Sequence, residues 1–179
     1  YETQVGPVTT PPQHQKILSY IDIAKGEDAT AALGGGAAGP ELGGGKYFVQ
    51  PTIFSGVNNR MRIAQEEVFG PVLSVIPFKD EDDAAQIAND VIFGLGSGVW
   101  TQSLNRAMRM ARRVRAGTVW VNTYRAVSFL MPFGGYKASG LGRENGQDAI
   151  YEFLQTKCVW ISTATDTPNP FIMRLPDGA

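Results

Sequence analysis

The residues best suited to chemistry in this chain are two neighbouring carboxylates, Glu66 and Glu67, followed closely by the aromatic ring of Phe69. A Gly-Pro pair and the apolar residues 72–78 come next, a pattern that predicts a turn leading into a short buried strand. A carboxylate beside an aromatic ring at the entrance of a strand suits a small-molecule site better than a plain surface or a core. This stretch is therefore the first candidate site.

General acid/base chemistry by the two adjacent carboxylates is a weak hypothesis. Neighbours in sequence project in different directions from a helix or a strand, so one carboxylate facing a site while the other faces solvent is more natural. His14 lies near a predicted helix start without an obvious partner, and we expect a surface histidine. Cys158 lies among apolar strand residues with no histidine nearby, which predicts a buried, inert thiol rather than a nucleophile.

Two glycine-rich patterns resemble phosphate-binding loops but lack the required context. Residues 34–39 satisfy the G-x-G-x-x-G pattern, yet Pro40 and further glycines follow where a helix would have to begin. Residues 39–46 approximate a P-loop, but the spacing is off by one and Tyr47 stands where Ser or Thr is required. We reject both and interpret residues 34–46 as a turn or exposed loop.

The composition is that of an ordinary globular protein, with 179 residues, 43% hydrophobic, 18% charged and a net charge of -1. Without a basic excess we expect no nucleic-acid partner, and the solvated face of one predicted helix accounts for a cluster of arginines, Arg106, Arg109, Arg112, Arg113 and Arg115. The single cysteine excludes a disulfide framework and a multi-cysteine metal site, and it predicts a reducing, cytoplasmic location. No apolar run approaches the ~18 residues of a membrane-spanning helix, so we expect no membrane partner.

The elements that must position these residues begin with a helix. Its predicted start is the Thr-Thr-Pro-Pro segment at residues 9–12, apolar residues then recur at helical spacing, and Gly26 ends it. Residues 30–33 are a weak strand candidate. Residues 47–54 have strand character interrupted by Pro51, which predicts an edge strand or a bulge.

Strands and helices then alternate as far as residue 121. Acidic residues at 80–83 predict the first turn of a helix, because negative charge is favourable at a helix N-terminus. Ser103 is predicted to cap a further helix that Gly117 ends, and residues 118–121 form a strong candidate for a buried strand. This alternation predicts parallel βαβ units and hence an α/β domain.

The last third of the chain is less regular. Residues 122–145 form a long segment without a clear period, and a loop this long in a compact domain is usually functional. A short helix is predicted at residues 147–154 and an alternating strand at residues 156–163. Residues 164–179 are interpreted as a tail.

Three segments resemble motifs of the aldehyde dehydrogenase superfamily: QEEVFGPVLSV at residues 65–75, AGTVWVN at 116–122 and PFGGYKASGLGREN at 132–145. The match is ordered and extends from residue 6 to residue 163. It implies an oxidoreductase that uses NAD or NADP, with NAD favoured, to convert an aldehyde to a carboxylic acid. In that family a cysteine attacks the carbonyl to form a thiohemiacetal, hydride passes to the nicotinamide, and water hydrolyses the resulting thioester.

The resemblance also implies the fold, an aldehyde-dehydrogenase-like α/β catalytic domain fragment of mostly parallel βαβ units with a C-terminal oligomerisation strand. Residues 1–151 match the C-terminal part of the catalytic domain, residues 152–163 the oligomerisation strand, and residues 164–179 form a tail. A terminal strand would leave an unpaired edge in a monomer, so we expect a homo-oligomer, either a dimer or a tetramer.

The resemblance assigns cofactor-binding residues at four positions of this sequence. Glu67 matches a carboxylate that hydrogen-bonds the hydroxyls of the nicotinamide ribose, and Phe69 matches an aromatic residue that lies beside the nicotinamide. Gln13 and Lys16 match positions that can approach the cofactor ribose.

Substrate-binding residues follow from the same resemblance. Phe133 matches a wall of the aldehyde tunnel, and residues 124–131 correspond to the loop that varies with substrate. Val127 and Phe129 are the pocket-lining candidates in that loop, and its apolar character suits a hydrophobic or aromatic aldehyde.

The catalytic groups of the family are not matched in this chain. The nucleophilic cysteine, the oxyanion-hole asparagine and the general-base glutamate all precede the matching region, and Cys158 falls in the assembly strand, so no residue here is assigned a catalytic role. Residues 41–46 imitate the general-base motif ELGGK, but an extra glycine and a surface-turn position exclude Glu41 as the base. We therefore expect a C-terminal portion of an enzyme that is inactive alone, and the first residue, Tyr1, fits a fragment or a processed product.

Two alternatives stay open. The chain could be a truncated, non-catalytic relative that serves as an assembly or binding module, which a start codon near Tyr1 would favour. Alternatively the whole enzyme could be an acylating, CoA-dependent semialdehyde dehydrogenase. An upstream coding sequence with a cysteine and an ELGGK motif would support an enzyme.

Overall fold

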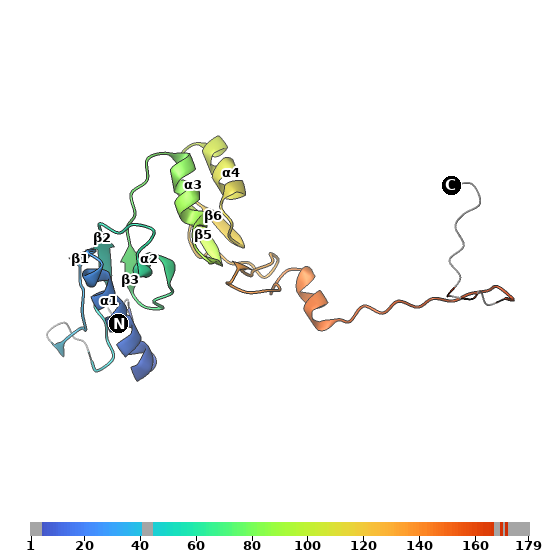
Figure 1. Cartoon of the computed structure of the whole chain (residues 1–179), viewed down its shortest axis with the longest axis horizontal. Helices are drawn as coiled ribbons and strands as arrows, with labels where there is room; N and C mark the ends of the chain where they lie inside the picture. Colours follow the sequence, from blue (N-terminus) through green and yellow to red (C-terminus); the bar gives the residue numbers. More distant parts are fainter. Residues whose placement is uncertain (1–4, 41–44, 167–168, 170, 172–179) are drawn as a thin grey trace.

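The computed structural model describes residues 5–40, 45–166, 169 and 171 of the chain. Two lobes of helix and sheet are followed by an extended C-terminal arm (Figure 1). The first lobe contains α1 (Pro11–Gly26), β1 (Thr30–Leu33), β2 (Thr52–Ser55), α2 (Arg62–Gln65) and β3 (Val72–Ser74). The second lobe contains α3 (Glu81–Asn89), β5 (Gly96–Val99), α4 (Leu104–Arg113) and β6 (Thr118–Val121). The predicted α/β class is confirmed.

Helix α1, Pro11–Gly26, begins and ends where the sequence predicts. The Thr10 hydroxyl accepts a hydrogen bond from the Gln13 main-chain N–H, which satisfies one of the free donors of the first turn. One face of the helix is buried in the core of the first lobe, which consists of Ile17, Ile21, Ala24, Ala29, Val49, Phe54, Val57 and Ile63.

The first lobe has a three-stranded sheet in the order β1-β2-β3. Strand β1, Thr30–Leu33, is antiparallel to β2, Thr52–Ser55, which in turn is parallel to β3, Val72–Ser74. Of the two alternatives expected from Pro51, the edge strand is wrong: Pro51 directly precedes β2, the central strand, where its missing N–H removes no bond of the ladder. A register shift does occur in the pairing of β1 with β2, but it lies between Ala31 and Leu33 of β1. Strand β3 is also shorter than the predicted strand at residues 72–78.

Both helices of the second lobe have side-chain caps. Helix α3, Glu81–Asn89, begins after Asp80, whose carboxylate accepts hydrogen bonds from two main-chain N–H groups of the first turn. Helix α4, Leu104–Arg113, begins after Ser103 as predicted and ends before the predicted Gly117. The apolar contacts between the helices and the neighbouring strands form a second, smaller core of Ala85, Met110, Val114 and Ala116.

Strands β5, Gly96–Val99, and β6, Thr118–Val121, are parallel, with α4 connecting them, which confirms the predicted βαβ unit. Strand β6 is half-buried rather than fully buried. Two residues of β4, Phe93–Gly94, pair antiparallel with β7, Tyr136–Lys137, and attach the long irregular segment to the second lobe. Helix α2, Arg62–Gln65, connects β2 to β3.

The C-terminal arm differs from the prediction. A 3-10 helix, η2, occupies Asp148–Phe153, close to the predicted helix, but residues 156–163 are extended without a strand partner among the described residues (Figure 1). An alternating sequence forms a strand only when another strand satisfies its backbone. As a consequence Cys158 is exposed, and the prediction of a buried thiol is wrong.

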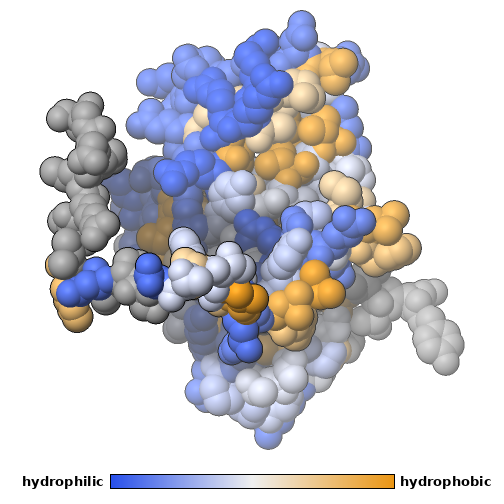
Figure 2. All heavy atoms as spheres, turned by 90° about the vertical axis from the view of Figure 1, so that its right-hand side faces the viewer, coloured by the Kyte–Doolittle hydropathy of each residue, from blue (hydrophilic) through white to orange (hydrophobic). Residues whose placement is uncertain are grey.

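Apolar side chains are also exposed elsewhere, and Figure 2 shows several separate apolar patches on the face of the molecule seen along the arm. Within the described part of the chain, no helix is long and apolar enough to cross a membrane.

Candidate functional site

Residues 66–70 connect α2 to β3 and carry the first predicted site; we call them the 66–70 loop. Glu67 and Phe69 are both exposed, and the Phe69 side chain retains 73% of its accessible surface. The φ angle of Phe69 is 54°, in the left-handed region that non-glycine residues rarely adopt. The loop thus presents a carboxylate and a ring to the exterior of the first lobe.

Gln13 and Lys16, the other two predicted cofactor residues, face this loop from α1. The Gln13 Nε2 group donates to the main-chain oxygens of Val68 and Phe69 at 3.0 and 3.1 Å. Lys16 Nζ donates to the main-chain oxygen of Glu67 at 2.9 Å. Because residues three apart lie on one face of a helix, both side chains reach the same short stretch of backbone. The structure therefore brings the four predicted residues together.

Glu66 is exposed as well, but its carboxylate is engaged by two neighbouring side chains of the first lobe. Its two carboxylate oxygens accept hydrogen bonds from Nε and Nη2 of Arg62 at 2.8 and 2.9 Å, and Oε2 also accepts from the Tyr20 hydroxyl at 2.5 Å. Hydrogen bonding by Arg62, and then by Tyr20, lowers the pKa of Glu66 to about 2. The hydrogen bond between Tyr20 and Glu66 also raises the pKa of Tyr20, because the carboxylate holds the hydroxyl proton.

The sequence reasoning missed this three-residue cluster. The spacing of Arg62 and Glu66, four residues apart in what became α2 and its cap, was a signal of an ion pair. Tyr20 offered no such signal, because it is brought to Glu66 only by the packing of α1 against α2.

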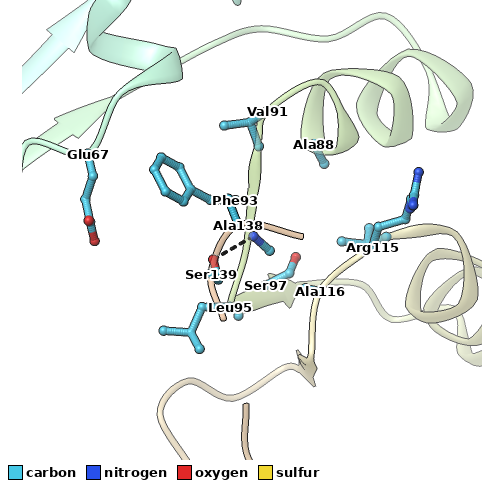
Figure 3. Close-up of a pocket in the computed structure, with 13 residues that line it drawn as sticks. Glu67, Ala88, Val91, Phe93, Leu95, Ser97, Arg115, Ala116, Ala138 and Ser139 are labelled. Atoms are coloured by element: carbon cyan, nitrogen blue, oxygen red, sulfur yellow. Dashed lines mark hydrogen bonds between the residues drawn. The ribbon is translucent and has the colours of Figure 1, made fainter. Parts of the chain in front are cut away.

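The Glu67 side chain lines a cavity of about 460 Å³ between the two lobes. Figure 3 shows Glu67 on one side of it, with the ring of Phe93 directed toward the glutamate from the opposite side. The Ser139 hydroxyl accepts a hydrogen bond from the Gly94 N–H at 2.9 Å and fixes one edge. The remaining lining is mostly apolar: Ala88, Val91, Leu95, Gly96, Ser97, Val114, Arg115, Ala116 and Ala138.

Two of the three predicted substrate residues line another cavity. Val127 and Phe133 border a space of about 410 Å³ beside β6, together with Gly117, Thr118, Val119, Trp120, Ala126, Ser128, Met131 and Pro132. Phe129 is not among these residues, and its ring is 79% exposed. Its assignment to the pocket stays a prediction.

Main-chain and side-chain bonds hold the walls of this second cavity. Trp120 Nε1 donates to the main-chain oxygen of Ala126 at 2.7 Å, and the Tyr124 ring contacts the indole edge-to-face with centroids 5.7 Å apart. Phe133 and Glu144 exchange two main-chain hydrogen bonds of 2.7 and 2.9 Å. The sequence reasoning gave Glu144 no part in this arrangement.

The remaining candidates have structural explanations. His14 is half-buried rather than on the surface, with its ring edge-to-face against Tyr47, and its Nε2 has no hydrogen-bond partner among the described atoms. The predicted exposed arginine face is confirmed, and Arg106 and Arg109 both pair with Glu81, whose pKa they lower.

The rejected general-base motif with Glu41 lies outside the described residues. Among the residues that the structure does describe, no group of three or more His, Cys, Asp or Glu could hold a metal ion.

The fold and the site define an α/β module that presents an acidic and aromatic loop beside a cavity. The model of the aldehyde dehydrogenase family matches residues 1–159, so the chain belongs to the aldehyde dehydrogenase family. An aldehyde dehydrogenase of Rhodospirillum rubrum is 52% identical over 163 residues, which are 90% of this chain and 32% of that protein. A betaine aldehyde dehydrogenase of Mesorhizobium japonicum is 45% identical over 172 residues, 95% of this chain and 35% of that protein.

The solved structures agree with the sequence relatives. The crystal structure of an indole-3-acetaldehyde dehydrogenase in complex with NAD+ matches with a TM-score of 0.83 and 46% identity, over 89% of this chain and 32% of that one. The chain therefore spans about a third of the length of the curated relatives and solved structures that it matches.

Proposed function

We propose that this chain is the C-terminal part of an NAD(P)-dependent aldehyde dehydrogenase, with NAD favoured, that oxidises an aldehyde to a carboxylic acid. The proposal rests on the difference in hydrogen bonding between the two adjacent carboxylates, Glu66 and Glu67. Glu66 is engaged by Arg62 and Tyr20, whereas the carboxylate of Glu67 lines the cavity and has no hydrogen-bond partner among the described residues.

The residues of the 66–70 loop fit the nicotinamide end of a dinucleotide. A free carboxylate can accept hydrogen bonds from both hydroxyls of a ribose, and an exposed ring can lie against a flat heterocycle. Glu67 and Phe69 supply these two groups from a loop whose backbone α1 holds. When bound, the cofactor supplies the hydride acceptor; Glu67 orients its ribose and Phe69 limits the position of its ring.

The nucleophile has to come from outside this chain. Cys158 is exposed on the extended arm, away from both cavities, and it lines neither of them. We therefore propose that the 179-residue chain contributes cofactor and substrate contacts and does not oxidise aldehydes alone.

The cavity beside β6 supports an apolar or aromatic aldehyde as substrate. Val127 and Phe133 border it, and its other side chains are mainly apolar, with no carboxylate or cationic group among them. A charged aldehyde would lose its hydration there without a compensating partner. We retain Phe129, in the same loop, as a candidate that the rest of the protein would bring to the pocket.

Residues 152–163 support assembly into a homo-oligomer, a dimer or a tetramer. Val159, Trp160 and Ile161 are 71%, 92% and 79% exposed in an extended segment that has no strand partner within the described chain. A strand from a second subunit would satisfy both its backbone and its apolar side chains. A cytoplasmic location, from the single cysteine, stays a prediction.

The test compares the complete protein, in which the upstream sequence precedes this chain, with the 179-residue chain. We expect the complete protein to reduce NAD in the presence of an aromatic aldehyde and to release the acid, and the chain alone to be inactive. Turnover by the chain alone that Cys158→Ala abolishes would refute the proposal. Product analysis with and without CoA shows whether the enzyme releases a free acid or forms an acyl-CoA. Inactivity of the complete protein would favour the non-catalytic assembly module.

A further inference from the structure

Residues 124–131 follow β6 and border the cavity beside that strand; we call them the substrate loop. Its large apolar side chains retain between 61% and 79% of their accessible surface: Tyr124, Val127, Phe129, Leu130 and Met131. Burial therefore contributes little to the position of the loop. A segment of this kind depends on the few hydrogen bonds and contacts that join it to the rest of the fold.

The chain enters the loop from a fixed point at the end of β6. Asn122 has a φ angle of 52°, and its side-chain amide bonds both main-chain groups of Thr101, just after β5. Oδ1 accepts from the Thr101 N–H at 2.8 Å, and Nδ2 donates to the Thr101 oxygen at 2.9 Å. These bonds join the ends of β5 and β6, so the path of the loop is decided after residue 122.

The far end of the loop is held by the main chain of residues 144–146. The Gly146 N–H donates to the Phe129 oxygen at 2.9 Å, and Phe133 and Glu144 exchange two main-chain bonds. Among the hydrogen bonds of the described residues, a single side chain joins the part between these two ends to β6. That side chain is Trp120.

The indole of Trp120 is held between the substrate loop and β5. Nε1 donates to the main-chain oxygen of Ala126 at 2.7 Å, and the Tyr124 ring lies edge-to-face against the indole. On the side of β5, a β-carbon built on Gly96 would lie 2.9 Å from Cζ3 of Trp120, so the indole packs directly on the Gly96 backbone. A rigid ring fixed in this way directs its only donor to one place.

Trp120 is also a wall of the 410 Å³ cavity, together with Ala126 and Val127. The oxygen that accepts the indole bond belongs to the peptide unit that joins Ala126 to Val127. Because a peptide unit is planar, fixing this oxygen also fixes the main-chain nitrogen of Val127. One hydrogen bond thus sets the position of the loop residue that borders the cavity relative to the strand that forms its opposite wall.

We propose that Trp120 is a positioning residue for aldehyde specificity, which holds the substrate loop, and with it Val127, against β6 through its indole N–H. The proposal rests on the proposed function, in which this cavity receives the aldehyde. A loop without the bond has to be ordered whenever a large aldehyde binds, and that ordering costs affinity. A small aldehyde makes few contacts with the loop and is little affected.

Trp120→Phe in the complete protein tests the proposal, because phenylalanine retains an aromatic ring and removes the donor. KM for phenylacetaldehyde should rise about fivefold, the scale of one hydrogen bond, while kcat and the KM for acetaldehyde stay within about twofold. Trp100→Phe is the matched control. The Trp100 indole makes no hydrogen bond among the described residues and lies outside this cavity, so the same substitution there should change neither constant.

Trypsin cleavage reports the state of the loop without any turnover. Arg125 is exposed and directly precedes Ala126, so cleavage after Arg125 requires this part of the loop to leave Trp120. Trp120→Phe should increase cleavage at Arg125 about fivefold relative to cleavage at Arg60, an exposed residue of the first lobe. Trp100→Phe should leave this ratio unchanged. Should Trp120→Phe fail to fold, Tyr124→Leu removes the ring contact from the loop side and replaces it in both measurements.

Three results would overturn the proposal, and they differ. An unchanged cleavage ratio, or a KM for phenylacetaldehyde that falls because the smaller ring enlarges the cavity, would make Trp120 a wall alone and leave the proposed function intact. An equal loss of kcat with both aldehydes would indicate a general structural role. Inactivity of the unsubstituted complete protein toward both aldehydes would remove the proposed function and the specificity role together, whatever the cleavage ratio.

Discussion

Lys16 and Glu67, 51 positions apart in the sequence, are joined by a 2.9 Å hydrogen bond from the lysine Nζ to the glutamate main-chain oxygen. The bond uses the backbone of Glu67 and leaves its carboxylate available to the cavity. A lysine that formed an ion pair with the Glu67 side chain would occupy the group that the proposed cofactor needs. The contact thus fixes the backbone of the 66–70 loop and leaves the Glu67 carboxylate free.

Replacement of Glu67 by Gln in the complete enzyme is expected to slow hydride transfer. The amide can still accept one hydrogen bond but loses the charge-assisted pair, which is worth about tenfold or more in rate. The measurement is turnover with ordinary and deuterated aldehyde, where the isotope effect on kcat should increase. Glu81→Gln, which removes a carboxylate paired with Arg106 and Arg109 in the other lobe, is the control and should leave the isotope effect unchanged.

Replacement of Glu66 by Gln is expected to remove a pH-dependent part of the stability. The pKa of Glu66 is lowered from its ordinary value of 4.5 to about 2, so its ionised form is favoured by the fold. That contribution is fully present above about pH 4.5 and is lost as the pH falls toward 2. Urea unfolding midpoints of the two proteins should therefore differ at neutral pH and converge in acid.

A difference between these midpoints that stays constant from neutral pH to pH 2 would contradict the assignment of the shift to Glu66. Arg62 supplies the largest cause of the shift. Arg62→Met should accordingly lower the unfolding free energy more when it is made in the original protein than when it is made in the Glu66→Gln variant. The reason is that the two side chains share one interaction, which the variant has already lost.

Replacement of Gly70 by Ala is expected to destabilise the first lobe. The added methyl group would meet Ile17 at 2.6 Å, and overpacking of this kind costs about 1–3 kcal/mol in unfolding free energy. Gly26→Ala is the matched control, since a β-carbon at Gly26 would have no atom within 4 Å and alanine has a higher helix propensity than glycine. In an Ile17→Ala background, Gly70→Ala should cost less than in the original protein.

Replacement of Val127 by Phe is expected to reduce the space beside β6 and to discriminate among aldehydes. The larger side chain occupies part of the 410 Å³ cavity, so KM for phenylacetaldehyde should rise about tenfold while that for acetaldehyde changes little. Ile92→Phe adds volume at an exposed position outside this cavity and should alter neither value. Equal effects on both aldehydes would contradict a substrate role for Val127.

Local elements were predictable from the sequence because their causes are local. Helices α1 and α4 begin at their predicted caps, Thr10 and Ser103, and α3 begins at the acidic turn after Asp80. Each of these signals acts on main-chain groups only a few residues away. The βαβ unit around α4 likewise follows from the alternation of short apolar runs with an amphipathic helix. The motifs indicated the family for the same reason, as contiguous residues in order.

Contacts between distant segments were not predictable. Pro51 was expected to mark an edge strand or a bulge, but the strand after it became central once β3 paired on its other side. Cys158 was expected to be buried, but its segment finds no strand partner within the described chain. In both cases the outcome depends on which other segment supplies hydrogen bonds to the backbone.

The sequence by itself determined which residues are available at the site: Glu67, Phe69, Gln13 and Lys16, together with the α/β elements that carry them. Only the tertiary structure decided how they are used, with the donors of α1 on the backbone of the 66–70 loop and the Glu66 carboxylate bonded to Tyr20 and Arg62. The physical reason is that a hydrogen bond depends on distance and direction, and both are set when α1 packs against residues some fifty positions away.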